Sequence, residues 1–268
     1  MTHFRVRTGE ENMSLKSMVE GFRDRSISLA RAIENGALVS SVKNIVRDGG
    51  DPNTQLLGEG KGITPLFVAA AEGNVGLIRT LKTMGADVHK SDEDGYKPIH
   101  FANGSLSTVE LSAGGSLADV LSKFGETPLH AAASNGDAEK VNTLLAMDAN
   151  PQMRGPSDRT PLHEAVLSFD STSVHLLLHG GADPNARDLD GMTPLHYATL
   201  YDGNAEQKLG IVRSLILDGA DPDMKDNDGD TPRHFAQYKE QENVLRTMND
   251  ACQDVAETKK ANEVEMEI

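Results

Sequence analysis

The sequence predicts an all-α solenoid, in which short helix–turn–helix units stack side by side, and three observations support this prediction. First, a phrase close to Thr-Pro-Leu-His recurs along the chain, with its prolines 33, 30, 33, 33 and 38 residues apart. Second, a phrase close to Gly-Ala-Asp-Pro follows most copies at a similar offset. Third, apolar residues between the two phrases fall at helical spacing, as Val141, Leu144 and Leu145 do. The six copies of the first phrase begin at Thr64, Lys97, Thr127, Thr160, Thr193 and Thr231.

The first helix of each unit has clear start and stop signals, which the copy at Thr127 illustrates. The threonine hydroxyl can accept a hydrogen bond from an unpaired backbone N–H at the start of the helix. Pro128 follows in the first turn, where its missing N–H costs nothing and its φ is already helical. The alanines at 131–133 let a neighbouring unit approach closely. Gly136 then ends the helix, because glycine readily adopts the left-handed conformation found there.

The second helix and the loop complete the unit. Gly181 closes the second helix of the next copy, and Asp183-Pro184-Asn185 opens a turn. Residues 188–191 then form the tip of a hairpin-like loop that leads to the following Thr-Pro. One unit cannot bury its own apolar face, and at least about three stacked units are needed for stability. We therefore expect a single elongated solenoid.

A period near 33 residues with Thr-Pro-Leu-His resembles the ankyrin repeat family. The resemblance covers about residues 27–251 and rests on two motifs that recur in phase. It implies about six repeats plus an N-terminal capping unit, which carries Gly50-Asp51-Pro52-Asn53. It also implies a protein-binding role, as an adaptor or scaffold, and no enzymatic activity.

We divide the chain into three regions. Residues 1–25 form an N-terminal extension, where Leu15, Met18, Val19 and Phe22 have the spacing of a short helix. Residues 26–252 form the repeat domain. Residues 253–268 form an acidic C-terminal tail, which we expect to be frayed or helical and not packed.

Two repeats depart from the pattern. The unit at 95–124 is three residues short, and Gly114-Gly115 make residues 107–115 unfavourable for a helix. Either Ala118-Asp119-Val120 takes the place of the usual loop phrase, or residues 117–124 form a displaced helix. Lys97 replaces the capping threonine, so that cap is expected to be lost. The unit from 191 carries extra residues at 201–206, which form a loop or a helix extension.

Composition limits the classes of partner. The net charge of −15 argues against nucleic-acid binding, which needs clustered Lys and Arg, and it favours a basic partner. The single cysteine, Cys252, cannot form an internal disulfide, so a reducing compartment, the cytoplasm or the nucleus, is expected. No run of 18 apolar residues and no secretory signal peptide are present, so we expect no engagement with membranes. We also expect the chain to be a monomer. A host-targeting effector of an intracellular bacterium, delivered by another signal, remains an alternative.

The histidines and acidic residues do not predict catalytic, cofactor-binding or metal-binding residues. The five motif histidines are expected to hydrogen-bond the motif threonine or nearby backbone, and they lie too far apart to share a zinc ion. His175 and His179 have the i, i+4 spacing of a chelate, but no third or fourth ligand is evident. The acidic loop at 226–230 lacks the register of a calcium loop. Carboxylates are expected on solvated loop tips, where they make poor acid–base groups. The motif histidines are His100, His130, His163, His196 and His234.

The resemblance also implies a binding surface, because partners of this family usually contact the loop tips and the exposed positions of the first helix. Leu189, Met192, Tyr201 and Tyr238 are the most informative members, since Tyr and Met are enriched in interface cores. The alternative is that the two tyrosines pack locally. The complete predicted patch comprises Glu93, Asp94, Tyr96, Glu126, Asn135, Arg159, Leu167, Leu189, Asp190, Met192, Leu200, Tyr201, Asn227, Asp228 and Tyr238.

A rival interpretation treats the chain as the substrate of another protein. Asn53 and Asn185 match the loop asparagine that an asparaginyl hydroxylase modifies in some ankyrin proteins. This hypothesis predicts modification at those asparagines without dependence on the residues of the patch.

Overall fold

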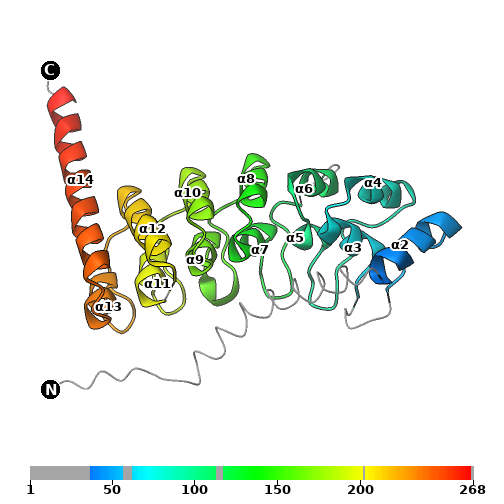
Figure 1. The fold of residues 1–268 in the computed structure, drawn as a ribbon, viewed down its shortest axis with the longest axis horizontal. Helices are drawn as coiled ribbons and strands as arrows, with labels where there is room; N and C mark the ends of the chain where they lie inside the picture. Colours follow the sequence, from blue (N-terminus) through cyan, green and yellow to red (C-terminus); the bar gives the residue numbers. More distant parts are fainter. Residues whose placement is uncertain (1–36, 57–61, 113–116, 202, 267–268) are drawn as a thin grey trace. The chain divides into compact units, whose positions relative to one another are not determined.

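The computed structural model describes residues 37–56, 62–112, 117–201 and 203–266, and in these residues it contains helices and no strand. After α2, the α-helices form six consecutive pairs, from α3/α4 to α13/α14, as Figure 1 shows. This arrangement confirms the predicted helix–turn–helix units and the all-α fold. The helices are α2 (Ala37–Asp48), α3 (Pro65–Glu72), α4 (Val75–Thr83), α5 (Pro98–Phe101), α6 (Ser105–Ser112), α7 (Pro128–Asn135), α8 (Ala138–Ala146), the 3₁₀ turn η1 (Pro156–Asp158), α9 (Pro161–Leu167), α10 (Ser171–His179), α11 (Pro194–Leu200), α12 (Ala205–Leu217), α13 (Pro232–Tyr238) and α14 (Glu242–Met266).

The chain divides into two compact units, Met1–Leu117 and Ala118–Ile268. In the first unit, α3 packs on α2, α4 and α5, and α4 packs on α6. In the second unit, the first helices of successive pairs (α7, α9, α11 and α13) pack on one another and form one layer. The second helices of the pairs form the other layer, so the apolar core of this unit lies between two layers of helices. These second helices are α8, α10, α12 and α14.

The core consists of aliphatic side chains of medium and small size, as the low aromatic content predicts. The motif leucines Leu129, Leu162 and Leu195 are fully buried, and Ala132 and Ala165 lie beside them in the same core. Small side chains on the first helices let adjacent helices pack at short range, where dispersion contacts are favourable.

Three buried motif histidines, His130, His163 and His196, each link their own repeat to the next one. His130 Nδ1 accepts a hydrogen bond from the backbone N–H of Thr127 at 3.3 Å, so the ring proton resides on Nε2. Nε2 then donates to the carbonyl of Arg159 in the following hairpin at 3.1 Å. His163 and His196 make the corresponding bonds to the carbonyls of Met192 and Asp230, both at 3.2 Å. The expected structural role of these three histidines is therefore confirmed.

The copies of the motif that begin at Lys97 and Thr231 differ from this pattern. Lys97 provides no side-chain cap, as predicted, although its backbone N–H still donates to His100 Nδ1 at 3.0 Å. His234 in the last repeat is exposed, and its Nδ1 lies 3.3 Å from Asp230 Oδ1. In the part of the chain that the structure describes, no hairpin follows α14, so this imidazole has no carbonyl of a next repeat to bind.

A second set of contacts joins successive turns. Asn185 Nδ2 donates to the carbonyl of Gly219 at 2.8 Å, and its Oδ1 accepts from the backbone N–H of Asp221 at 2.8 Å. Asn53 makes the same pair of bonds with Gly85 and Asp87 in the first unit. The amide side chain in each turn therefore satisfies two backbone groups of the next turn.

The structure of the irregular repeat at residues 95–124 decides between the two alternatives for its loop and shows that one expectation was wrong. The expectation that the segment from Ser107 forms no helix is wrong for residues 107–112, because α6 spans Ser105–Ser112 and the two glycines come after its end. Residues 117–127 contain no helix, and Asp119 Oδ1 accepts from the N–H of Asn150 at 2.9 Å, as Asn185 does from Asp221. Ala118-Asp119-Val120 thus takes the place of the loop phrase, and the alternative prediction of a displaced helix at residues 117–124 is wrong.

The remaining expectations concern the insertion and the chain ends. Of the inserted residues, Tyr201, Gly203 and Asn204 lie in a loop, whereas residues 205–206 belong to α12, which begins at Ala205 with Asn204 as its N-cap. The acidic tail continues α14 as far as Met266, and its residues 256–262 are exposed. The stripe from Leu15 to Phe22 lies outside the described residues. None of the helices in the described part of the chain has the length and apolar character needed to cross a membrane.

Two glycine substitutions should change stability in opposite directions. A Cβ at Gly155 would lie 2.8 Å from His130 Nε2, so Gly155→Ala should lower the free energy of unfolding by about 1–3 kcal/mol. A Cβ at Gly210, in α12, meets no atom within 4 Å, so Gly210→Ala should raise it by about 0.5–1 kcal/mol. Urea unfolding followed by circular dichroism measures both, and equal effects would contradict the close contact at Gly155.

Acidification should destabilise the fold through the buried histidines. Burial lowers the pKa of His130 to about 4 and that of His163 to about 3, and protonation would also remove the acceptor that Nδ1 provides. An unfolded histidine has a pKa of ~6.5. The stability that the two neutral histidines contribute is therefore complete above that pH, and it decreases as the pH falls toward 4 and then 3. The slope is about 1.4 kcal/mol per pH unit for each histidine. The urea concentration at the unfolding midpoint, measured from pH 7 to 4.5, should therefore fall less steeply for His163→Gln than for the wild type. Parallel curves of midpoint against pH would show that His163 does not cause this pH dependence.

Candidate protein-binding surface

Most of the predicted patch lies on the first-helix layer and the hairpin tips of the second unit. We call this region the tip-and-helix surface, and its members are exposed or half-buried: Leu167, Leu189, Asp190, Met192, Leu200, Tyr201, Asn227, Asp228 and Tyr238. Glu126 and Asn135 also belong to the second unit, before and at the end of α7. Glu93 and Asp94 lie on a hairpin tip of the first unit, so the structure gives them no defined place beside the others.

An apolar row runs along the ends of the first helices. Leu167, Leu200 and Tyr238 are the last residues of α9, α11 and α13, and each of these helices packs on the next. Tyr238 is 66% exposed, and the two leucines are half-buried. The row therefore presents three large apolar side chains from three successive repeats.

The hairpin tips beside this row are built by buried or half-buried aspartates. Asp188 Oδ1 accepts from the backbone N–H groups of Asp190 and Met192, at 3.0 and 2.8 Å. Asp226 Oδ1 makes the same bonds in the next tip, to Asp228 and Asp230, at 3.0 and 2.9 Å. Because one carboxylate holds two backbone groups, each tip has a defined conformation.

Successive tips are also bonded to one another. The N–H of Leu189 donates to the carbonyl of Ser157, and that of Asn227 donates to the carbonyl of Asp190, both at 3.0 Å. Asn227 Nδ2 adds a bond to the carbonyl of Leu189 at 2.9 Å. Leu189 is nevertheless 63% exposed, so its apolar side chain projects from a well-ordered backbone.

Two arginines connect the loops that carry these tips. Arg187 Nη1 donates to the carbonyl of Lys225 at 2.8 Å, and Arg154 Nη1 donates to the carbonyls of Asp158 and Arg187. Ser157 and Asp158 have φ values of 58° and 59°, in the left-handed region that non-glycine residues seldom adopt. The tip at 157–158 is held in a strained conformation by these surroundings.

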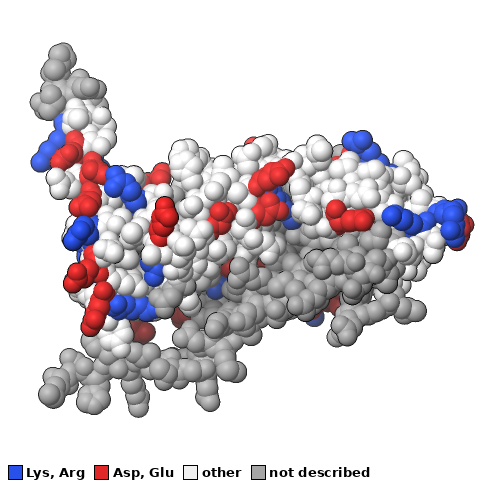
Figure 2. Space-filling model, in the orientation of Figure 1, with Lys and Arg blue, Asp and Glu red and all other residues white. Residues whose placement is uncertain are grey.

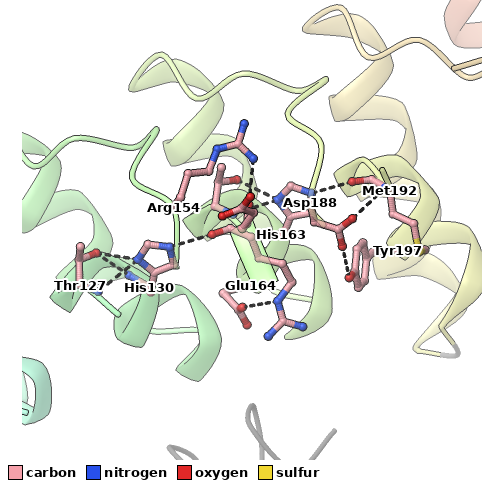
Figure 3. A network of polar contacts seen from close by, with 11 residues as sticks. Thr127, His130, Arg154, His163, Glu164, Asp188, Met192 and Tyr197 are labelled. Carbon is pink, nitrogen blue, oxygen red and sulfur yellow. Dashed lines mark hydrogen bonds and ion pairs between the residues drawn. The ribbon is translucent and has the colours of Figure 1, made fainter. Parts of the chain in front are cut away.

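A buried polar network lies beneath the tip-and-helix surface (Figure 3). Arg159 is 3% exposed and its Nε lies 3.0 Å from Oε1 of Glu164, which is 4% exposed. Tyr197 donates its phenol proton to Asp188 Oδ2 at 2.5 Å. Burial raises the pKa of Glu164 against the opposing effect of Arg159, and it raises the pKa of Asp188 against the hydrogen bond from Tyr197.

Some predicted members of the patch are turned into the fold. Arg159 belongs to the buried network, and Tyr96 is 3% exposed and packs edge-on against His100 and Phe101. Tyr201 is half-buried and stacks on Tyr197, with ring centroids 5.7 Å apart, whereas Tyr238 stays exposed. The alternative that the tyrosines pack locally therefore describes Tyr201, much of whose side chain is buried by such packing, but it does not describe Tyr238.

The buried network was missed because carboxylates were expected on solvated tips. Asp188 begins a tip, yet it is 7% exposed, and its carboxylate accepts hydrogen bonds from two backbone N–H groups and from the Tyr197 hydroxyl. A signal for Glu164 was present in the sequence, since its equivalents in the other repeats are all apolar. They are Val68, Phe101, Ala131, Tyr197 and Phe235.

The buried carboxylates of this region are engaged with other side chains of the protein. Among the described residues, no group of three or more His, Cys, Asp or Glu side chains is placed to hold a metal ion. The buried carboxylates are occupied by Arg159 and Tyr197, which leaves them with internal partners. On the face shown in Figure 2, acidic and basic side chains of the described residues are interspersed over the helices.

Comparison with known proteins identifies relatives of the repeats. The family profile described as "Ankyrin repeats (3 copies)" matches residues 29–115 and 102–188, and "Ankyrin repeats (many copies)" matches residues 176–236. The ankyrin repeat domain of Bcl-3, a member of the IkappaB protein family, has a TM-score of 0.61 and 27% identity, covering 81% of this chain and 97% of that chain. An ankyrin repeat domain from Acinetobacter baumannii AYE has a TM-score of 0.63 and 23% identity, covering 70% of this chain and 97% of that one.

A curated sequence relative covers a shorter stretch. Transient receptor potential cation channel subfamily A member 1 from Homo sapiens is 34% identical over 94 residues, which is 33% of this chain. The chain spans only 8% of the length of that channel subunit, so the similarity is confined to a small part of it.

The ion pair of Arg159 and Glu164 should behave as a buried pair. Glu164→Leu alone leaves the guanidinium buried without its counter-ion and should cost about 3–5 kcal/mol of unfolding free energy, as should Arg159→Met alone. The double variant removes both charges and should be much closer to the wild type. A double-mutant cycle from urea unfolding measures the coupling, and additive losses would show that the two side chains do not depend on each other.

Proposed function

Because the chain belongs to the ankyrin-repeat family, we propose that it is an adaptor or scaffold that acts by binding a partner protein and not by catalysis. Ankyrin repeats are generally protein–protein interaction modules, and the described part of this chain contains six helix pairs of that kind. A reducing compartment such as the cytoplasm is the proposed place of action.

The observation that carries the proposal is the exposure of large apolar side chains on one face of the second unit. Leu189 and Tyr238 are 63% and 66% exposed, and Leu167, Met192 and Leu200 are half-buried on the same surface. Monomeric proteins seldom leave such side chains clustered without a use, and Tyr and Met are enriched at interface cores. We propose the tip-and-helix surface as the docking site.

Charge supports a partner with both apolar and basic side chains. Asp158, Asp190 and Asp228 are exposed on three successive tips. The nearby Arg154 and Arg187 are engaged with backbone carbonyls, which fixes their guanidinium groups against the loops. Exposed acidic tips accelerate the association of a basic surface, and this effect weakens as salt concentration rises.

Two narrower functions remain within this proposal. A host-targeting effector would use the same surface, and the identity of the partner would decide that role. As a hydroxylase substrate, the chain would be modified at Asn53 or Asn185. Each of these side chains is half-buried in a turn and makes two hydrogen bonds to the next turn, so an enzyme would first have to open those bonds.

A capture experiment with a matched control tests the docking site. Three proteins are immobilised on a support and incubated with native lysate: the full chain, a Leu189→Ala/Tyr238→Ala variant and a Leu217→Ala control. The proteins that each one retains are identified by mass spectrometry. Leu217 is 47% exposed but lies on α12, in the second-helix layer. We expect a partner that binds the wild type and Leu217→Ala, is lost from the double variant, and dissociates more readily at high salt.

Other outcomes point to different conclusions. Equal capture by all three proteins would show that the partner uses another surface. An added oxygen atom at Asn53 or Asn185, found in the recovered chain together with equal capture, would favour the hydroxylase hypothesis. Circular dichroism melts must first show that the double variant is folded.

A further inference from the structure

Helix α10 carries two exposed histidines that already lie side by side. His175 and His179 are one turn apart, and their ring centroids are 4.1 Å apart with an interplanar angle of 42°. We propose that these two imidazoles form a chelating site for a divalent transition-metal ion, with Zn²⁺ as the defining case. The site is independent of the tip-and-helix surface, because α10 belongs to the second-helix layer.

The helix that carries the pair is rigid. Asp170 caps its start and accepts from the N–H groups of Thr172 and Ser173, at 3.2 and 3.1 Å. Val174 and Leu177 are fully buried and anchor the opposite side of the helix. Because the backbone is fixed, bringing the two imidazoles to one ion requires only side-chain rotation.

The two rings are close enough to share one zinc ion after their side chains rotate so that one nitrogen of each points at the same ion. Zinc binds imidazole nitrogens at about 2.0–2.1 Å, which places two such nitrogens about 3.4 Å apart in a tetrahedral site. Rings whose centroids are 4.1 Å apart can reach that separation by small rotations. The i, i+4 arrangement of two histidines on one helix face is also the spacing that zinc enzymes use for two of their ligands.

The surroundings permit a cation there. His179 lies in the last turn of α10, where the helix carbonyls concentrate partial negative charge. The equivalent outward positions on the adjoining helices are Asn142 and Ala146 on α8, and Arg213 and Leu217 on α12. Arg213 is the charged member of these four, and its Nη2 is paired with Asp254 Oδ2 at 2.7 Å.

The ligand set defines the affinity and the selectivity. No third protein ligand is placed nearby among the described residues, so water completes the coordination and binding is weaker than in a structural zinc site. Imidazole ligands favour Zn²⁺ over the oxygen-seeking Mg²⁺ and Ca²⁺. Four of the other described histidines differ: His130, His163 and His196 have both ring nitrogens engaged, and exposed His89 has no histidine one turn away.

Zinc titration of the full chain tests the proposal. The protein is freed of metal with a chelator and titrated with ZnCl₂ by calorimetry at pH 7.5. We compare the wild type, His179→Gln, His175→Gln/His179→Gln and a His89→Gln control. The wild type and the control should bind one ion alike, and both variants of the pair should bind at least tenfold more weakly.

A second readout makes the result specific to the pair. In the nuclear magnetic resonance spectrum, the imidazole signals that shift first with zinc should be those absent from the double variant, and MgCl₂ should leave them unchanged. The proposal is overturned if the double variant and the wild type titrate alike, or if the first signals to shift belong to other histidines. Since both side chains are exposed, the variants should keep the wild-type circular dichroism spectrum.

Discussion

The hydrogen bond from each buried motif histidine to the hairpin of the next repeat is the interaction on which the rest of the second unit depends. It fixes the imidazole tautomer, because Nδ1 is occupied by the N–H of the motif threonine and only Nε2 can donate. It also sets the position of the next tip: His163 holds the carbonyl of Met192, whose side chain belongs to the tip-and-helix surface. A buried, repeated sequence element therefore determines where exposed, non-repeated side chains lie, and the surface can vary without loss of the fold.

The network of Arg159 and Glu164 adds a different kind of constraint. The histidine bonds recur from repeat to repeat, whereas a buried charge pair occurs where Glu164 replaces the apolar residue of the other copies. Such a pair contributes little net stability compared with well-packed apolar residues, but separating it is costly. Its effect is to tie one hairpin to one helix, since Glu164 on α9 retains Arg159 at the foot of the strained tip at 157–158. The pair thus makes this tip different from its neighbours.

Local signals in the sequence predicted most of the helix starts but not the direction of every side chain. Thr-Pro marks a cap and a first turn through local geometry, so α7, α9 and α11 begin where expected. Glycine pairs mark where a helix stops, and reading Gly114-Gly115 as breakers of the preceding segment led to the wrong expectation for α6. Equivalence between repeats placed Arg159 and Tyr96 on the binding surface, but each is buried against residues of its own repeat. Arg159 pairs with Glu164, and Tyr96 packs against His100 and Phe101. Phe101 and Glu164 occupy the same position of the motif, where the copies differ, so equivalence between repeats did not predict the burial.

The two layers of the second unit separate the two proposed kinds of binding. The first helices and tips present exposed apolar side chains and carboxylates, a combination that would exclude water around a docked protein partner. The second helices turn mostly polar side chains outward, and on α10 two of these are adjacent imidazoles. A cation on α10 would stabilise that helix by mass action without contacting the tips. Partner capture that changed on zinc binding would therefore require coupling through the core shared by α9 and α10, where Leu162, Val174 and Leu177 are fully buried.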